Sequence, residues 1–384
     1  MAQYTIIATA AMGLEALVAK EVRALGYECT VDNGKVIFKG DETAIARANM
    51  WLRTADRVKI QVAQFKALTF DELFEGTKAI PWENFITEDG EFPVAGKSHK
   101  SKLFSVSDCQ AIVKKAIVER LKRAYNRIAR FEETGPLFKL EIAMLKDIAT
   151  ITLDTSGVGL HKRGYRVEQG EAPLKETLAA ALVMLSNWQP DRPLIDPFCG
   201  SGTIAIEAAL IGQNIAPGFN REFVSEGWPW MPESVWDKVR VEVEEQANYD
   251  QPLRISGYDI DHRMIEIAKK NAMEAGFGDL ITFKQMQVSD ITINEKYEQY
   301  GVIIGNPPYG ERLSDQAAVE KMYTEMGKVF QQYETWSVYM LTSHEGFERF
   351  YGKPATKKRK LFNGFIKTDF YQYWGKRPPR NATT

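Results

Sequence analysis

The sequence predicts an α/β protein whose last domain is a mostly parallel sheet ending in an antiparallel hairpin, preceded by two α+β units. Strand and helix signals first follow the order βαββαβ. Beyond Pro173 they become a repeat of strand, loop and helix, which is typical of a parallel sheet covered on both faces. Asn363-Gly364, between two apolar runs, is a strong hairpin signal. We therefore predict domains at residues 1–66, 67–160 and 161–384.

The first unit contains the βαββαβ pattern. Gly26 is expected to stop its first helix, and Asp41 to cap its second. A turn at Asp32, Asn33 and Gly34 predicts a hairpin between the two helices. The expected elements are a strand at Tyr4–Ala8, a helix at Leu14–Leu25, hairpin strands at Tyr27–Val31 and Val36–Phe38, a helix from Asp41 through Leu52, and a closing strand at Val58–Val62.

The second unit is expected to carry a long basic helix. Its other predicted elements are a helix at Phe70–Thr77, an extended piece at Glu91–Ala95, and apolar segments at Leu137–Met144 and Ile148–Leu153. The long helix is predicted from Asp108 to about Arg130. Its apolar residues recur at helical spacing, so we expect that stripe in the core and the lysines and arginines outside.

The third unit is predicted to be the sheet domain. Its expected strands are Leu194–Ile195, Ile255–Tyr258, Ile281–Phe283 and Val302–Ile304, followed by hairpin strands at Lys358–Phe362 and Phe365–Trp374. A nicotinamide-dinucleotide domain lacks such a hairpin ending. An acidic, tryptophan-bearing insertion lies at Phe219–Tyr249, and we assign it no site because such segments more often pack or form lids.

Positive charge is concentrated in two stretches, although the formal net charge is only −2. Lys97–Arg130 has ten Lys or Arg against two acids, and Lys353–Arg380 has nine against one. One such run would be read as a solvated helix face. Two runs flanking a nucleotide-type motif instead favour a polyanionic partner.

Several classes of protein are disfavoured. Hydrophobic residues make up 44% and charged residues 26%, which is the mix of a globular protein. No run of about 18 apolar residues and no basic secretion signal is present, so we expect no membrane partner and a cytoplasmic location. The three cysteines and four histidines are scattered, which disfavours a disulfide framework or a metal site.

A glycine-rich turn follows the first predicted strand of the third unit. It reads Asp196-Pro197-Phe198-Cys199-Gly200-Ser201-Gly202-Thr203 and precedes a helical run. Gly200 and Gly202 allow the backbone to approach a nucleotide-like ligand closely. The spacing is not G-x-G-x-x-G and the P-loop lysine is missing, so an adenosine without phosphate fits best. The expected cofactor residues here are Asp196, Phe198, Gly200, Gly202 and Thr203.

Acidic residues follow the next two strands. Asp259, beside Ile260, is placed to accept hydrogen bonds from two ribose hydroxyls, while Asp261 could simply cap the next helix. Asp290, after the third strand, could receive an adenine amino group. On its own Asp290 would be a loop acid, and its order in the chain favours the binding role. Asp259, Ile260 and Asp290 therefore join the predicted cofactor residues.

The segment Asn306-Pro307-Pro308-Tyr309 directly follows an apolar strand and is the predicted catalytic turn. A base's exocyclic amine attacks poorly because its lone pair is delocalised into the ring. The Asn306 side-chain oxygen and the Pro307 carbonyl can each accept one N–H bond and redirect that lone pair. Tyr309 offers a flat face for an unstacked base. A merely rigid turn is the alternative, and the two preceding motifs favour catalysis.

The residues just before the sheet domain could reach the cofactor from the other side. Pro173 is expected to begin a helix whose first turn, with Lys175 and Thr177, closes over the cofactor. An interdomain linker helix is an equally good interpretation of these residues.

The three motifs in this order resemble those of the class I amino-methyltransferases, and the whole chain is similar to their bacterial THUMP-domain branch, related to the 23S rRNA guanine-N2 methyltransferases. The resemblance implies a Rossmann-like methyltransferase domain behind ferredoxin-like and THUMP domains. It implies S-adenosylmethionine as cofactor, and 23S rRNA or a large-subunit assembly intermediate as partner. The residues expected to face RNA are Lys97, Ser98, Lys100, Lys102, Lys114, Lys115 and Arg163.

Other functions stay open on the residues alone. The same catalytic turn serves adenine N6 in DNA enzymes, and guanine N2 of tRNA is also a suitable acceptor. The basic N-terminal half favours RNA, because a DNA enzyme more often carries a separate target-recognition domain. A noncatalytic RNA-binding assembly factor and a nicotinamide oxidoreductase are further alternatives.

Overall fold

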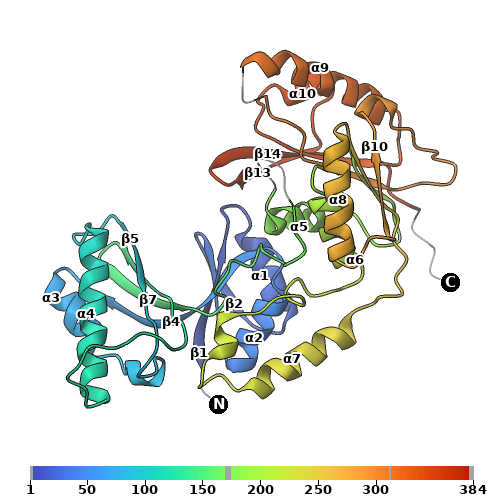
Figure 1. Cartoon of the computed structure of the whole chain (residues 1–384). Coiled ribbons are helices and arrows are strands. Elements are labelled where there is room, and N and C mark those ends of the chain that lie inside the picture. Colours follow the sequence, from blue (N-terminus) through green and yellow to red (C-terminus); the bar gives the residue numbers. More distant parts are fainter. Residues whose placement is uncertain (1–2, 169–173, 311–312, 380–384) are drawn as a thin grey trace. The chain divides into compact units, whose positions relative to one another are not determined.

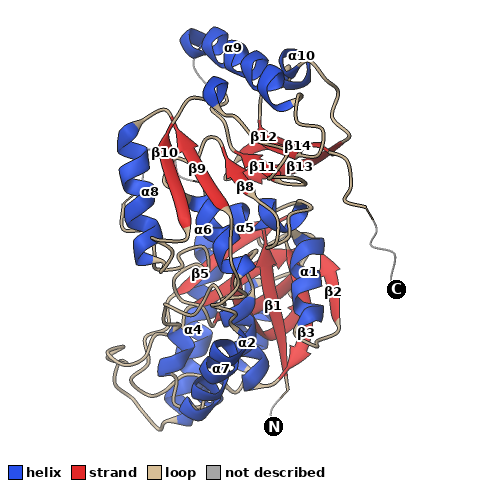
Figure 2. Cartoon of the chain, turned by 90° about the vertical axis from the view of Figure 1, so that its right-hand side faces the viewer, coloured by secondary structure: helices blue, strands red, loops and turns tan. Residues whose placement is uncertain are grey.

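The computed structural model describes residues 3–168, 174–310 and 313–379, which form two compact units (Figures 1 and 2). The first unit holds the chain up to Ala10 together with Val18–Leu160 and Arg221–Glu242. The second holds Ala11–Leu17, His161–Asn220 and the chain from Val243 onward. The segment Arg221–Glu242 of the predicted insertion thus belongs to the first unit, while the three-domain division of the sequence stays a prediction.

The first unit is built on one seven-stranded sheet of order β2-β3-β1-β4-β7-β6-β5. Its elements are β1 (Tyr4–Ala10), α1 (Glu15–Ala24), β2 (Cys29–Asp32), β3 (Lys35–Gly40), α2 (Glu42–Trp51), β4 (Ala55–Lys66), α3 (Phe70–Lys78), η1 (Trp82–Asn84), β5 (Val94–His99), α4 (Val106–Ala124), β6 (Leu140–Leu145) and β7 (Ile148–Asp154). The βαββαβ order is confirmed. The twelve-residue β4 pairs with β1 and with β7, so both predicted α+β units share this sheet.

Two boundaries in the first unit were wrong. The long helix α4 ends at Ala124 rather than near Arg130, since Asn126 has a left-handed φ of 50° that an α-helix does not continue through. The extended piece expected at Glu91–Ala95 is the strand β5, Val94–His99. Polar Lys97, Ser98 and His99 obscured it because β5 lies at the end of the sheet order, where a strand need not be apolar.

The second unit contains the other seven-stranded sheet, of order β10-β9-β8-β11-β12-β14-β13. Its elements are α5 (Glu176–Leu185), β8 (Leu194–Asp196), α6 (Thr203–Gly212), β9 (Ile255–Asp259), α8 (His262–Glu274), β10 (Ile281–Gln285), η3 (Val288–Asp290), β11 (Val302–Gly305), α9 (Leu313–Phe330), β12 (Ser337–Thr342), α10 (Phe347–Tyr351), β13 (Lys357–Asn363) and β14 (Ile366–Tyr373). Between α6 and β9 lie η2 (Val224–Gly227) and α7 (Glu233–Gln246).

The mostly parallel sheet with an antiparallel end is confirmed. The pairs β10/β9, β9/β8, β8/β11 and β11/β12 are parallel, whereas β12/β14 and β14/β13 are antiparallel. Apolar clusters lie on the sheet; one includes Leu182, Ile206 and Ile304, and the other includes Ile303, Tyr323 and Met340. The sequence analysis did not single out β12, because all six of its residues are buried and show no alternation.

The terminal hairpin turns one residue later than expected. Asn363 pairs with Ile366, so the two-residue loop is Gly364-Phe365 and Gly364 has a φ of 63°. A positive φ at the first loop position is what a tight hairpin needs, and glycine adopts it without strain. Asn363 is therefore the last paired residue of β13, and the strand rather than the turn determines the direction of its side chain.

Candidate active site

The predicted cofactor and catalytic motifs lie after strands β8, β9 and β11, which are neighbours in the parallel part of the sheet. The carboxyl ends of parallel strands meet at one edge, where open α/β sheets bind their ligands. Gly200 and Gly202, between β8 and α6, have φ values of 50° and 82°. A Cβ on Gly202 would stand 3.0 Å from the Phe283 ring, so the turn requires glycine there.

Asp259 holds the glycine turn in place. One of its carboxylate oxygens accepts a hydrogen bond from the Gly200 amide at 3.0 Å, and the other accepts from the Asp261 amide at 2.9 Å. Each oxygen keeps lone-pair capacity for a further donor such as a ribose hydroxyl. Asp261 caps α8 through the Arg263 amide, so the alternative role weighed for Asp261 is present beside that of Asp259.

Ile260 and Asp290 fit an adenosine ligand. The Ile260 side chain directly follows β9 and is 69% exposed, so it presents an apolar surface next to Asp259. Asp290 is exposed in η3 after β10, and one of its oxygens accepts from the Gln287 side-chain amide at 3.1 Å. An apolar face beside accessible carboxylates suits an uncharged nucleoside with hydroxyl and amino donors.

Asp196 is the buried acid of the site. It is 1% exposed and accepts a hydrogen bond from the Phe198 backbone amide at 3.1 Å. It also interacts electrostatically with Asp259. Burial, with a smaller contribution from Asp259, raises the pKa of Asp196 to about 8. Burial therefore favours the neutral form of Asp196 near neutral pH. Phe198 is half-buried next to it.

Arg166 is a residue of this site that the sequence analysis did not select. Its guanidinium donates to the Glu176 carboxylate at 2.8 Å, the Leu174 carbonyl at 2.9 Å and the Thr203 hydroxyl at 3.0 Å. It thus ties the start of α5 to the glycine turn. The motif Arg163-Gly164-Tyr165-Arg166 was the only signal in the sequence, and nothing in it separated the two arginines.

The predicted cofactor residues of α5 are placed differently from one another. Lys175 is exposed at the N-cap, whereas Thr177 is only 3% exposed. Pro173, the expected start of the helix, lies outside the described residues. Both residues remain candidates, with Lys175 the more accessible.

The prediction for Arg163 was wrong. We expected it to face RNA, but it is 3% exposed and its guanidinium lies 3.3 Å from the Glu207 carboxylate. The Tyr165 hydroxyl donates to the same carboxylate at 3.0 Å. Glu207 sits in the apolar, almost fully buried helix α6, where a carboxylate needs a cation and hydrogen bonds to stay charged. Arg163 therefore serves the core of the second unit.

The predicted catalytic turn emerges from β11 and is held by hydrogen bonds. The Tyr309 hydroxyl donates to the Asn306 side-chain oxygen at 2.6 Å. The side-chain amide of Asn363, in β13, donates to that hydroxyl at 3.3 Å. The Tyr323 hydroxyl donates to the Pro308 carbonyl at 2.7 Å. Asn306 and Tyr309 are half-buried, Pro307 is buried and Pro308 is exposed. The contact from Asn363 was not expected, because the sequence placed that residue in a turn.

The expected RNA residues of the first unit fall into two groups. The Lys97 ammonium pairs with Glu141 at 2.9 Å, and that of Lys114 pairs with Glu133 at 2.7 Å. The Ser98 hydroxyl donates to the Leu103 carbonyl at 2.7 Å and so serves the loop before α4. Lys100, Lys102 and Lys115 are exposed, and no ion pair holds their ammonium groups in the described part of the chain. These three are the exposed lysines of the group without an ion-pair partner in the described part of the chain, since exposed Lys97 pairs with Glu141.

The described residues offer neither a metal site nor a membrane-spanning helix. Within residues 3–168, 174–310 and 313–379, no three His, Cys, Asp or Glu side chains gather closely enough to hold a metal ion. No helix in the described ranges is both long enough and apolar enough to cross a membrane.

Family models match three stretches of the chain. Residues 163–372 match the RMKL-like methyltransferase domain, residues 5–59 the RlmL ferredoxin-like domain, and residues 67–154 the THUMP domain. The first match covers more than half of the chain and includes every predicted cofactor and catalytic residue. The matches to the three domains follow the order expected from the sequence.

Relatives are similar over essentially the whole chain. A Bacillus subtilis protein named "Putative RNA methyltransferase YpsC" is 70% identical over 100% of this chain and 99% of its own. A Listeria monocytogenes structure, described as a predicted N6-adenine-specific DNA methylase, is 65% identical with a TM-score of 0.94, covering 98% of this chain and 97% of its own. A structure described as "SMU.472, a putative methyltransferase complexed with SAH" is 52% identical with a TM-score of 0.94, covering 98% of this chain and 100% of its own.

The raised pKa of Asp196 predicts a pH-dependent cost to stability. Between about pH 4 and pH 8 the folded chain holds this proton and the unfolded chain releases it, so stability falls by up to about 1.4 kcal/mol per pH unit as pH rises. Asp196→Asn removes this cost. The thermal midpoint of this variant minus that of the wild type should therefore increase from pH 5 to pH 8. The same difference for Asp191→Asn, at an exposed position, should not change with pH. A difference that stays constant with pH would contradict this.

The burial of Arg163 predicts a large cost for removing its partner. Glu207→Gln should lower the free energy of unfolding by about 3–5 kcal/mol, because an uncompensated charge stays buried. Glu266→Gln, which breaks a surface pair with Lys269, should cost less than about 1 kcal/mol. The double variant Arg163→Met/Glu207→Leu should recover part of the loss. Denaturant unfolding measures all three, and equal costs for the two single variants would refute the buried pair.

Proposed function

Because the chain belongs to the family of RMKL-like methyltransferases, we propose that it transfers a methyl group from S-adenosylmethionine to N2 of a guanine in 23S rRNA. S-adenosylmethionine is the cofactor, as the family and its SAH-bound member show. The observation that carries the proposed chemistry is the Asn306–Tyr309 turn after β11, the strand that pairs with β8, which precedes the glycine turn; Asp259 ends β9, the next strand along. The cytoplasm, where rRNA is assembled, is the proposed compartment.

The catalytic turn suits an exocyclic amine. The Asn306 side-chain oxygen has two lone pairs, and the Tyr309 hydroxyl uses one of them, so one is left for an amine N–H. A second N–H bond to the Pro307 carbonyl would point the nitrogen lone pair away from the ring. When bound, the cofactor would supply a methyl group whose S–C bond breaks as the N–C bond forms, and the amine would then release one proton to solvent. The residues of the turn orient the amine for this displacement.

RNA is the proposed polymer. A THUMP domain precedes the catalytic domain, and Lys100, Lys102 and Lys115 present exposed positive charge on it. The names of the relatives point both to RNA and to adenine in DNA, so N6 of adenine and guanine N2 of tRNA are the alternative acceptors. A noncatalytic assembly factor is a weaker alternative, since it would not need the ordered Asn306–Tyr309–Asn363 contacts.

The acceptor is tested by incubating the purified chain with labelled S-adenosylmethionine and three polymers in parallel: unmodified 23S rRNA, unmodified tRNA and duplex DNA. We expect label in 23S rRNA, and nuclease digestion should recover it as N2-methylguanosine. Label as N6-methyladenine in DNA, with none in rRNA, would sink the proposal. Label in tRNA alone would retain the chemistry and reassign the polymer.

The role of Asn306 gives a separate prediction. Asn306→Ala should lower kcat by about 10²–10³ because the developing charge on the amine loses its oriented acceptor. Binding of SAH, followed by thermal shift, should stay at the wild-type level because Asn306 is not among the cofactor residues. Asn294→Ala, an exposed asparagine in the same unit, is the matched control. Full activity of Asn306→Ala would show that the orienting mechanism is wrong even if the family is right.

A further inference from the structure

The second unit contains a cavity of 500 Å³ that none of the predicted site residues line. It lies where β12 begins, where β14 ends and where β13 begins, next to the end of α5. The catalytic turn follows the opposite end of β11, the parallel neighbour of β12. The cavity is therefore a different place from the methyl-transfer site, on the same sheet.

The lining of this cavity is strongly basic. Five of its residues are cationic and no Asp or Glu is among those that line it: Arg192, Lys357, Arg359, Lys376 and Arg377. Lys376 pairs with Glu334, which lies outside the lining, and Arg359 donates to the Gly13 carbonyl at 2.7 Å. Lys357 and Arg377 are exposed and have no ion-pair partner among residues 3–168, 174–310 and 313–379. Such a surface selects a phosphate-bearing ligand.

An aromatic side chain completes the lining. Trp374 is 48% exposed, and its indole N–H donates to the Gln372 side-chain oxygen at 3.3 Å, which fixes the ring. Exposed aromatic rings beside cations are how proteins bind single-stranded nucleic acid, because a base stacks on the ring while cations contact the phosphates.

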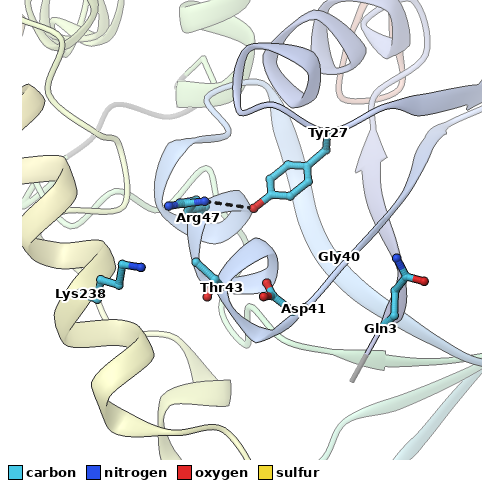
Figure 3. Close-up of a pocket in the computed structure, with 7 residues that line it drawn as sticks. All are labelled: Gln3, Tyr27, Gly40, Asp41, Thr43, Arg47 and Lys238. Carbon is cyan, nitrogen blue, oxygen red and sulfur yellow. Dashed lines mark hydrogen bonds between the residues drawn. The ribbon is translucent and has the colours of Figure 1, made fainter. Parts of the chain in front are cut away.

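The cavity of the first unit does not share this chemistry. Its volume is 640 Å³, and Figure 3 shows Asp41, Arg47 and Lys238 among its lining residues. Arg47 pairs with Glu242 at 2.7 Å and donates to the Tyr27 hydroxyl at 3.5 Å, which Figure 3 draws as a dashed line. An acid in the lining and a neutralised arginine give this cavity no preference for an anion.

Strand β13 connects the basic cavity to the catalytic turn. It carries Lys357 and Arg359 near its start and Asn363 at its end, with Leu361 between them buried in the core. The first two line the cavity, and Asn363 donates to the Tyr309 hydroxyl at 3.3 Å. From Lys357 to Asn363 the strand rises by about 20 Å. At 3.4 Å per nucleotide, this is about six nucleotides of stacked strand.

We propose that the path of the substrate RNA reaches from the catalytic turn to this cavity, so that a single-stranded nucleotide about six positions from the methylated base stacks on Trp374 and its phosphates contact Lys357 and Arg377. The inference rests on the proposed RNA methylation and adds a second RNA contact on the catalytic domain itself. It gives a role to the basic residues that lie in and just after the terminal hairpin, among them Lys357 and Arg377.

The test compares kinetic constants for methylation of unmodified 23S rRNA. Lys357→Ala/Arg377→Ala should raise KM for RNA about tenfold or more and leave kcat and SAH binding unchanged. The slope of log affinity against log salt should become shallower by about 1.4, because each of the two lost phosphate contacts contributes about 0.7. Trp374→Ala should also raise KM for RNA, and Trp374→Phe should restore it.

The control variant is Lys284→Ala/Lys328→Ala, which removes two exposed lysines from β10 and α9. Its KM for RNA and salt slope should equal those of the wild type. If Lys357→Ala/Arg377→Ala also has the KM for RNA and the salt slope of an active wild type, the RNA path is wrong and the proposed function stands. If RNA KM is unchanged but binding of 5′-GMP is lost, the pocket binds a free nucleotide, which also overturns the path. If the wild type labels no RNA, the proposed function fails and takes the path with it.

Discussion

The hydrogen bond from the Gly200 amide to the Asp259 carboxylate is the constraint on which the rest of the site depends. It joins the ends of two adjacent parallel strands, β8 and β9, through one charged acceptor. The bond fixes a glycine turn whose positive φ angles cost little only because no Cβ is present. Asp196 is buried beside this turn, and that burial raises its pKa.

The buried polar groups around the turn act as a support for it. Arg166 reaches from α5 to Thr203, and Arg163 neutralises Glu207 one helical turn further along α6. Removing water from such groups is costly, so each has a hydrogen-bonded or ionic partner close by. These contacts therefore link the edge of the sheet that binds the cofactor to the helices α5 and α6 that pack on the sheet.

Much of the fold followed from local patterns, and much of the site did not. Apolar strands, glycine turns and the hairpin signal predicted most strands of the two sheets, because burial and positive φ leave a clear mark on a sequence. Asn363 was predicted as a turn residue, and only the register of β13 with β14 places it against Tyr309. Arg163 and Arg166 look alike in sequence, and only burial separates a core cation from a site cation. The cavity around Trp374 is formed by residues far apart in the chain.

The central claim is that the turn after β11 orients an exocyclic amine of an RNA base. Nucleoside mass spectrometry of 23S rRNA, tRNA and genomic DNA from cells lacking this protein tests it most directly, because the method identifies the base, the modified atom and the polymer together. The account predicts that N2-methylguanosine decreases in 23S rRNA and returns when the wild-type chain, but not Asn306→Ala, is supplied. Unchanged rRNA with loss of N6-methyladenine from DNA would contradict it.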